Sequence, residues 1–248
     1  MADDPQPGTI TRRRFLGGAV TLVCASPLVG PLLSGCSSAG AARPTRIDGW
    51  DVPPGTVLTP ERFARLAALF DALVPGDEAA PGATQAHAAW YLDQLFGAFN
   101  VDPPRIFAGG PYSGRHGGLD GFRQFQPLTR VERIRWQTYL EGSRGIPARE
   151  FNGPVVGVIQ QYEEQLDALP VVGGRRFTAL DVDERRSVAG GLDEAFLTTA
   201  YRHAVEGTYS DPVYGGNFEG RGWAVIDYEG DRQPGGYTPH QIAHPEEG

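Results

Sequence analysis

The chain has 248 residues, 40% of them hydrophobic and 10% aromatic, a composition that excludes an intrinsically disordered protein. All 22 basic residues are arginines, they stand against 30 acidic residues, and the formal net charge is −8. Such a balance leaves no broad basic field, so we expect no nucleic-acid partner.

The first 35 residues have the pattern of a cleaved export signal. An apolar stretch runs over residues 15–33, but five glycines and prolines interrupt it, which is typical of a cleaved signal and not of a permanent membrane span. It is preceded by T-R-R-R-F-L-G, which is similar to the twin-arginine consensus, with the defining residues at Arg12, Arg13, Phe15 and Leu16. The twin-arginine route exports folded proteins, often with a bound cofactor or partner. An ordinary N-terminal helix is the alternative.

The apolar stretch ends in L-S-G-C, which resembles the lipoprotein signal, where the cysteine is acylated and the chain is cut before it. We therefore predict a signal peptide over residues 1–35 and a lipid anchor at Cys36. The mature chain would be a cell-membrane lipoprotein on the outer face of the cytoplasmic membrane or in the periplasm. The only other cysteine, Cys24, lies in the leader, so no disulfide is expected. Residues 36–56 are rich in small residues and proline and are predicted to form a flexible tether.

Residues 57–248 predict a mainly α protein, a single helical domain with long loops and an irregular C-terminal tail rich in glycine and aromatic residues. Thr59 followed by Pro60 is a helix-start signal, and apolar residues at spacings of three and four predict a helix over residues 60–74. A long loop is expected over residues 102–121. Four further helices are predicted over residues 84–99, 128–142, 157–169 and 181–206. No run of comparable length has the period of a strand.

The sequence contains no recognisable catalytic motif. There is no G-x-S-x-G elbow, no P-loop, and no thiol nucleophile once Cys36 is acylated. His240 and His244 have helical spacing but lie in a proline-flanked tail, so no metal site is expected. One alternative stays open, an enzyme with an acid–base cluster formed by His203, Glu206, Asp211 and Tyr214.

The segment from His203 onward differs from the helical sequence before it. It reads H-A-V-E-G-T-Y-S-D-P-V-Y-G-G-N-F-E-G-R-G-W-A-V-I-D-Y, without helical period, and its glycines permit tight turns and close backbone approach. Five of its residues are aromatics of the kinds enriched at the buried centres of protein interfaces: Tyr209, Tyr214, Phe218, Trp223 and Tyr228. The segment therefore indicates an interaction surface.

Within this segment, S-D-P-V-Y-G-G-N followed by G-W closely resembles the signature of the gluconate 2-dehydrogenase subunit 3 family. The phrase L-T-P-E-R-F-A-R-L-A-A-L-F-D-A-L-V-P looks like the opening helix of that family, and the resemblance covers about residues 57–229. Family members are small non-catalytic subunits of membrane-bound dehydrogenases for sugars, polyols or alcohols. Their large subunit is a FAD-dependent flavoprotein of the glucose-methanol-choline type, and a cytochrome c subunit often completes the complex.

The resemblance implies an accessory subunit that binds no cofactor itself. The large subunit would fold around FAD in the cytoplasm and be exported, stabilised and anchored by this chain. Cys36 departs from many relatives and suggests direct anchoring of the complex by lipid in place of a cytochrome anchor. The residues expected to contact the flavoprotein are His203, Ser210, Asp211, Pro212, Tyr214, Gly215, Gly216, Asn217 and Trp223.

Two other interpretations stay open. In the first, the signature residues serve the chain itself: Asp211 and Pro212 begin a turn, the glycines and Asn217 continue it, and Trp223 fills the core. In the second, the chain is an independent lipoprotein that binds a small ligand in a helical pocket.

Overall fold

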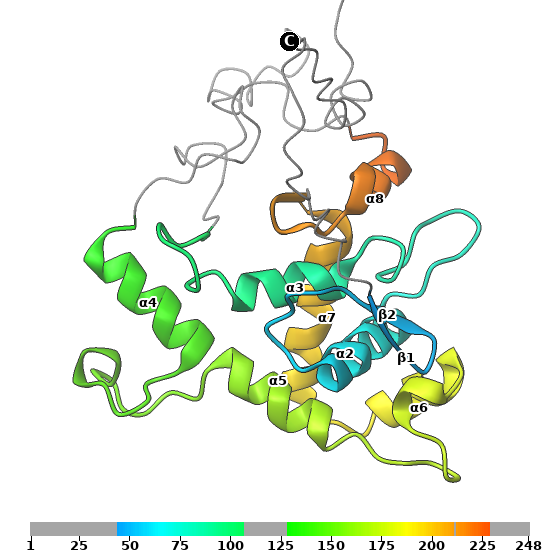
Figure 1. Ribbon diagram of the computed structural model, residues 1–248, viewed down its shortest axis with the longest axis horizontal. Helices are drawn as coiled ribbons and strands as arrows, with labels where there is room; N and C mark the ends of the chain where they lie inside the picture. The colour runs from blue at the N-terminus through cyan, green and yellow to red at the C-terminus, as the bar shows by residue number, and fades with distance from the viewer. Residues whose placement is uncertain (1–43, 107–127, 211, 229–248) are drawn as a thin grey trace, which may run out of the picture. The chain divides into compact units, whose positions relative to one another are not determined.

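The computed structural model describes residues 44–106, 128–210 and 212–228, and within them the fold is mainly helical, as predicted (Figure 1). Residues 42–248 form one compact unit. Several predicted features lie outside the described residues: the export signal with Arg12, Arg13, Phe15 and Leu16, the lipidation site Cys36, most of the 102–121 loop, Asp211, His240 and His244.

A short hairpin precedes the helices and consists of β1 (Thr45–Ile47) and β2 (Trp50–Val52). The helices, labelled as in Figure 1, are α2 (Pro60–Leu73), α3 (Ala88–Phe96), α4 (Arg130–Glu141), α5 (Val158–Asp167), α6 (Val182–Ala189), α7 (Glu194–Tyr209) and α8 (Arg221–Val225). Short 3₁₀ turns are η1 (Pro147–Arg149), η2 (Phe177–Ala179), η3 (Pro212–Tyr214) and η4 (Phe218–Gly220). In the ranges described, no helix is long and apolar enough to cross a membrane.

Helix α2 begins where the sequence predicts and lies centrally among the other elements. The Thr59 hydroxyl accepts a hydrogen bond from the Arg62 amide, and Pro60 occupies the first turn, where an amide hydrogen has no helical partner. Its apolar residues are buried against the hairpin, α3, α5, α6 and α7. The predicted helices over residues 128–142 and 157–169 are confirmed as α4 and α5.

Tyr162 of α5 lies at the centre of the core and has no exposed surface. Its ring makes edge-on contacts with Phe70, Phe96 and Phe196 at centroid distances of 6.4, 5.5 and 5.0 Å. These three rings belong to α2, α3 and α7, so one tyrosine connects the four helices that form the core.

The hairpin occupies part of the segment that the sequence predicts to be a flexible tether, so the 36–56 boundary is wrong from residue 45 onward. The two strands are antiparallel, with Thr45 opposite Val52. Val52 is buried in the core, and the Trp50 indole donates a hydrogen bond to the Thr178 carbonyl at 2.9 Å. Strands of three residues are too short to show a period, and the hairpin packs against residues distant in sequence such as Thr178, so local patterns do not reveal it.

The predicted 181–206 helix is two helices. Asp181 caps α6 through a 2.9 Å bond from the Glu184 amide, and the Glu184 carboxylate accepts from the Asp181 amide at 3.1 Å. A turn at Gly190 and Gly191 follows, and Asp193 caps α7 by accepting from the Phe196 amide at 2.8 Å. Asp193 is the sequence signal that marks the break.

Two further helix ends differ from the prediction. Helix α7 continues past Gly207 to Tyr209, because this glycine serves close helix packing: a β-carbon added there would lie 2.7 Å from the Ala88 Cα of α3. Helix α3 is shorter than the predicted 84–99, since His87 adopts a left-handed conformation (φ 58°) and residues before it form a turn. The close approach of α3 and α7 positions the segment described next.

The buried carboxylate of Asp93 joins α3 to the segment before α2. It accepts hydrogen bonds from the Val57 and Leu58 amides, both at 2.9 Å, and the side chain has no exposed surface. We expect Asp93→Asn to lower the free energy of unfolding by about 1–2 kcal/mol, because a charged acceptor is replaced by a neutral amide beside two buried donors. Urea unfolding measures the change.

Asp77→Asn is the matched control. Its carboxylate also accepts from two backbone amides, those of Ala79 and Ala80 at 2.8 Å, but in an exposed turn. We expect a change below about 0.5 kcal/mol for this surface position. Equal losses in the two variants would contradict the role assigned to burial at Asp93.

Candidate docking site

Residues 207–223, here called the signature loop, fold back onto α3 and α7. The Asn217 amide donates to the Gly207 carbonyl at 2.6 Å, and the Phe218 amide donates to the Ala86 carbonyl at 3.2 Å. These bonds join the loop to the last turns of α7 and to the turn before α3. Beyond α7 the loop is irregular, as predicted, apart from η3, η4 and α8.

Asn217 closes the signature loop from the inside. Its side chain is fully buried; the amide nitrogen donates to the Ser210 carbonyl at 2.9 Å, and the amide oxygen accepts from the Gly222 amide at 2.8 Å. Its backbone is left-handed (φ 43°), a conformation that asparagine tolerates better than most residues. One side chain therefore connects residues on both sides of η3 and η4.

Two glycines of the loop are steric requirements. A β-carbon on Gly216 would lie 2.5 Å from the Gly207 carbonyl oxygen and 2.7 Å from the Tyr91 Cβ. One on Gly222 would lie 2.2 Å from the Thr208 carbonyl oxygen. Because the neighbours are mostly backbone atoms, they cannot move aside independently, and the loop packs tightly only with glycine at both positions.

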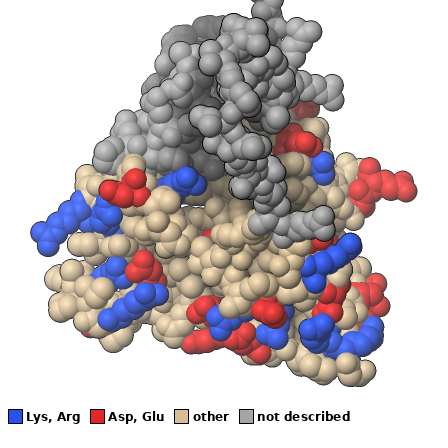
Figure 2. Space-filling model, viewed as in Figure 1, with Lys and Arg blue, Asp and Glu red and all other residues tan. Residues whose placement is uncertain are grey.

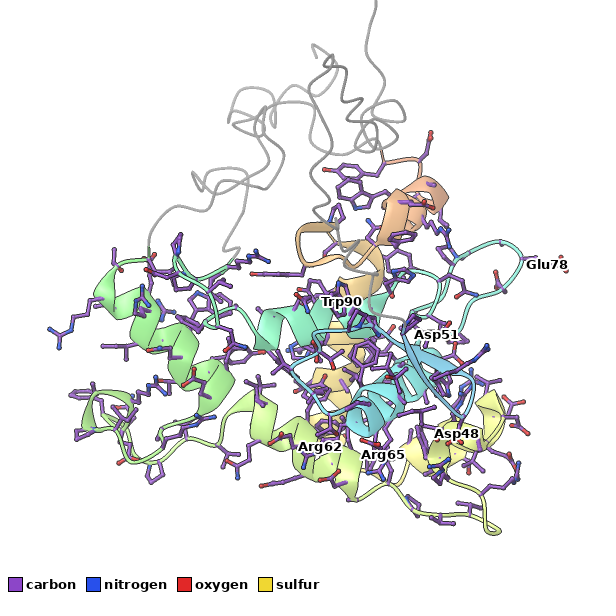
Figure 3. All side chains as sticks on the ribbon, viewed as in Figure 1. Asp48, Asp51, Arg62, Arg65, Glu78 and Trp90 are labelled. Atoms are coloured by element: carbon purple, nitrogen blue, oxygen red, sulfur yellow. The ribbon has the colours of Figure 1, made fainter. Side chains whose placement is uncertain are left out.

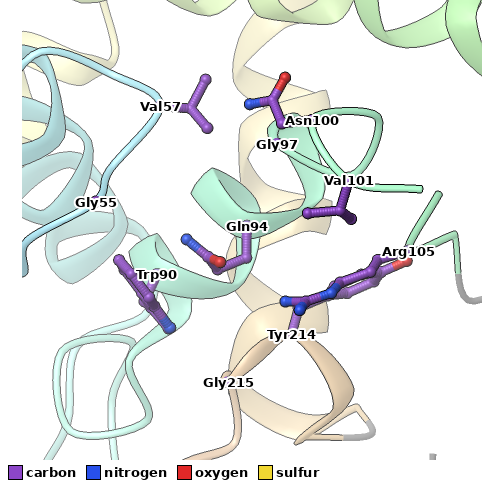
Figure 4. Close-up of a pocket in the computed structure, with 10 residues that line it drawn as sticks. All are labelled: Gly55, Val57, Trp90, Gln94, Gly97, Asn100, Val101, Arg105, Tyr214 and Gly215. Atoms are coloured by element: carbon purple, nitrogen blue, oxygen red, sulfur yellow. The ribbon is translucent and has the colours of Figure 1, made fainter. Parts of the chain in front are cut away.

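Gly215 lies against the ring of Trp90, where an added β-carbon would be 2.6 Å from the indole Cδ1. A cavity of about 350 Å³ opens beside this contact, with Trp90 and Gln94 of α3 on one side and Tyr214 and Arg105 on the other (Figure 4). The signature loop thus forms part of a small hollow at the surface of α3.

The outer side of the signature loop and α8 exposes apolar side chains. We call docking face the set formed by Phe218 (37% exposed), Val225 (42%), Ile226 (63%) and Tyr228 (40%). Trp223 holds α8 in place beneath it, since its indole donates to the Tyr209 carbonyl at 2.8 Å and its ring contacts Tyr228 edge-on at 5.1 Å.

The structure separates the nine predicted contact residues into groups. His203, Tyr214, Gly216 and Asn217 are buried within the chain, which favours the intramolecular interpretation for them, and their contact with a partner stays a prediction. Pro212 is exposed, while Ser210, Gly215 and Trp223 are partly exposed, and for these four contact stays a prediction. Asp211 lies outside the described residues. The sequence did not predict Val225 and Ile226 as contact residues. Their only signal is that they form an apolar pair after Trp223 that belongs to no predicted helix.

His203 is held between two tyrosines. Its Nε2 lies 3.0 Å from the Tyr139 hydroxyl and its Nδ1 lies 2.9 Å from the Tyr162 hydroxyl, so one hydroxyl donates to the ring and the other accepts from it. Burial lowers the pKa of His203 to about 4, and the imidazole is therefore neutral at pH 7. Both ring nitrogens are occupied, which leaves none to exchange a proton with a substrate.

Glu206 serves a separate contact on α7. Its carboxylate accepts a hydrogen bond from the Tyr91 hydroxyl at 3.3 Å, and partial burial raises its pKa, although the residue as a whole is exposed. The Tyr91 ring packs edge-on against Tyr214 at 5.5 Å. Glu206 and Tyr214 both contact Tyr91, whereas Tyr139 and Tyr162 occupy the two ring nitrogens of His203, which argues against an acid–base role for His203.

A larger cavity of about 880 Å³ lies among the hairpin, α2, α3 and η2. Small, polar and charged side chains line it together with four aromatic ones, Trp50, Phe63, Phe70 and Trp90. Trp90, labelled in Figure 3, also borders the smaller cavity. Arg185 borders it too, donates to Asp71 at 2.7 Å and lies over the Trp50 ring at 4.9 Å. Each charged group in the walls has an ion-pair partner, Arg185 with Asp71, Asp48 with Arg176 and Asp51 with Arg46, so the cavity favours an uncharged molecule.

Among the described residues, no group of three histidine, cysteine or acidic side chains could hold a metal ion. Comparisons of the chain with family models, curated proteins and solved structures found no match. The functional interpretation therefore depends on the residues and their geometry.

Proposed function

We propose that this chain is the non-catalytic accessory subunit of a membrane-bound, FAD-dependent dehydrogenase of the glucose-methanol-choline type that acts on sugars, polyols or alcohols. The large subunit holds FAD and performs the reaction. The chain escorts it through twin-arginine export, stabilises it, and anchors it through a lipid on Cys36. One observation supports this proposal above the others: a rigid signature loop presents an apolar docking face to solvent.

The docking face combines rigidity with exposure. Asn217, Gly216 and Trp223 fix the loop from within through hydrogen bonds and close packing. An apolar surface that is already ordered loses little conformational entropy when a partner covers it, so more of the burial energy becomes affinity. Four side chains within residues 218–228 leave 37–63% of their surface exposed in the monomer, and such apolar patches are typical of protein interfaces.

The other parts of the proposal come from the sequence. A twin-arginine leader selects folded cargo. A flavoprotein that binds FAD before export could therefore cross the membrane in complex with a partner that carries the leader. The lipoprotein cysteine then provides attachment to the membrane. In this arrangement the signature residues inside the loop shape the docking face, and the residues on its outside make the contact.

The direct test is to express the full chain with the flavoprotein encoded beside it and purify the chain from membranes. We expect a second, larger subunit in the preparation and the visible absorption spectrum of a flavin. A chain that elutes alone, colourless and stably folded, in the presence of that flavoprotein would overturn the proposal.

Ile226→Glu tests the docking face itself. Placing a charge in the middle of an apolar contact leaves that charge unpaired on burial, so we expect affinity for the flavoprotein to fall at least about tenfold. Binding can be measured by titrating one purified subunit with the other. The control is Val171→Glu. Val171 is 64% exposed, much as Ile226 is 63% exposed, but it lies in the connection between α5 and η2. Equal effects of the two variants would argue against the docking face.

The larger cavity favours a second candidate, an independent lipoprotein that binds a small apolar ligand. Its volume of about 880 Å³ falls in the range of small-molecule pockets, and four aromatic side chains line it. Trp50 and Trp90 line it, so binding of an apolar compound should change tryptophan fluorescence and raise the melting temperature. A monomer that shows both changes and does not bind the flavoprotein would favour this candidate.

A further inference from the structure

Helix α4 and the loop after it, residues 128–157, form a second exposed surface, here called the α4 surface. Only Leu140 of the twelve residues in α4 is buried. Of the fifteen large hydrophobic residues that are exposed in the described ranges, six belong to this surface: Val131, Tyr139, Ile146, Phe151, Val155 and Val156. In Figure 1 this surface lies at the left of the view and α8 at the upper right.

The loop of the α4 surface is firmly held. The Ser143 hydroxyl accepts from the Val155 amide at 2.6 Å, and the Val155 carbonyl accepts from the Ser143 amide at 2.9 Å. Arg149 is nearly buried and donates to the Glu141 carboxylate at 2.9 Å. At the outer end of this loop, Phe151 is 93% exposed. A rigid loop therefore projects a single phenylalanine into solvent.

Four of the five arginines of the α4 surface form no ion pair within the described residues. Nine of the fifteen arginines in the described ranges form an ion pair with a carboxylate. Of the six that do not, four lie here: Arg130, Arg133, Arg135 and Arg144. Figure 2 shows basic side chains on the side of the view where α4 lies and also on the opposite side, where acidic side chains accompany them. Residues 128–157 hold five arginines and three glutamates, a balance of +2 in a chain of −8.

The chemistry of this mixture favours a bilayer over a protein. Arginine is enriched in protein interfaces too, so the distinction lies in its partners: four arginines here form no ion pair among the described residues, and lipid phosphates would supply the missing negative charge. Here the apolar side chains are interspersed with unpaired arginines, and aromatic residues stand beside them, which is typical of surfaces that lie at the headgroup level of a membrane. We infer that the α4 surface binds a bilayer containing anionic phospholipid, with the arginines on lipid phosphates and Phe151 inserted below them.

The charge of the remaining chain orients this contact. The whole chain has a formal charge of −8 and the α4 surface one of +2, so the remaining residues have a formal charge of −10. An anionic bilayer repels that remainder and attracts residues 128–157, so the molecule meets the membrane with one face. The corrected start of the fold is consistent with this: between Cys36 and β1 there are eight residues, which reach at most about 30 Å.

The test uses the chain that follows Cys36, residues 37–248, which contains the whole compact unit of residues 42–248. Its binding to vesicles is measured by flotation, with phosphatidylglycerol and phosphatidylcholine in equal parts, and with phosphatidylcholine alone. We expect binding to the anionic vesicles only, and release by salt. Phe151→Ala should weaken binding about tenfold, and the triple variant Arg130→Gln, Arg133→Gln, Arg135→Gln at least about tenfold.

Matched controls come from α7. Tyr201 is 52% exposed and Arg202 is exposed without an ion pair in the described ranges, so Tyr201→Ala and Arg202→Gln remove the same kinds of group elsewhere. Both should bind as the parent chain does, and circular dichroism checks that every variant has the parent helix content.

No binding to anionic vesicles, or equal losses in the controls, would overturn the inference. If the α4 variants instead weaken binding of the flavoprotein, the α4 surface is a protein interface. The assay contains no partner, so its failure leaves the proposed function standing.

Discussion

Gly216→Ala is expected to destabilise the protein by about 3 kcal/mol, because the added methyl group meets the Gly207 backbone and the Tyr91 Cβ, neither of which can turn aside. It would lie 2.5 Å from the Gly207 carbonyl oxygen, which already accepts the 2.6 Å hydrogen bond from the Asn217 amide. Relief requires the signature loop to move away from α7 and break that bond. Urea unfolding should show a lower midpoint, and affinity for the flavoprotein should fall with it.

Gly190→Ala is the control for the same chemical change. Gly190 has a helical conformation, and its added β-carbon would be 3.5 Å from the nearest carbonyl oxygen, an ordinary contact. We expect a change within about 0.5 kcal/mol, since alanine also favours helical backbone. If Gly216→Ala were as mild as this control, the signature loop would be free to shift, and the rigidity on which the docking face depends would be refuted.

The helices could be predicted from the sequence because their signals are local. Thr59 and Pro60 mark the start of α2 within four residues of chain, and Asp181 with Glu184 does the same for α6. The hairpin could not be predicted in this way, since contacts with distant residues hold its strands in place. Trp50, for example, contacts Thr178, 128 positions away. Its stabilisation depends on the tertiary fold, which short-range patterns do not encode.

The candidate site was predictable as a segment but not residue by residue. The glycines and Asn217 point to a loop with special backbone needs, and the structure places them inside it. Burial depends on which helices the loop meets: Tyr91 and Ala88 of α3 decide that Gly216 and Gly207 face inward. Ile226 has no pattern of its own, and its exposure follows only from the way Trp223 anchors α8. Residues that shape a surface and residues that present it cannot be separated without the fold.

Lowering the pH from about 6.5 to about 4 is expected to remove about 3 kcal/mol of stability through His203 alone. In the unfolded chain its imidazole binds a proton below about pH 6.5, whereas in the folded protein burial delays this to about pH 4. Between these values the unfolded state binds more protons than the folded state, so stability falls as pH falls. Above about pH 7 both states hold a neutral ring and the contribution is complete.

His203→Gln isolates this contribution, because an amide can still donate to one tyrosine and accept from the other while having no charge to gain. The variant should lose some stability at pH 7 but show a much flatter dependence between pH 6.5 and 4, measured by urea unfolding. Burial also lowers the pKa of His87, which lies in contact with Phe218, so His87→Gln must be compared separately. Paired carboxylates such as Asp167 act below this window, since its unfolded pKa of 3.8 is lowered further by Arg62. An unchanged slope in His203→Gln would mean that the ring between Tyr139 and Tyr162 accepts a proton in the folded state, and the neutral, purely structural role of His203 would have to be abandoned.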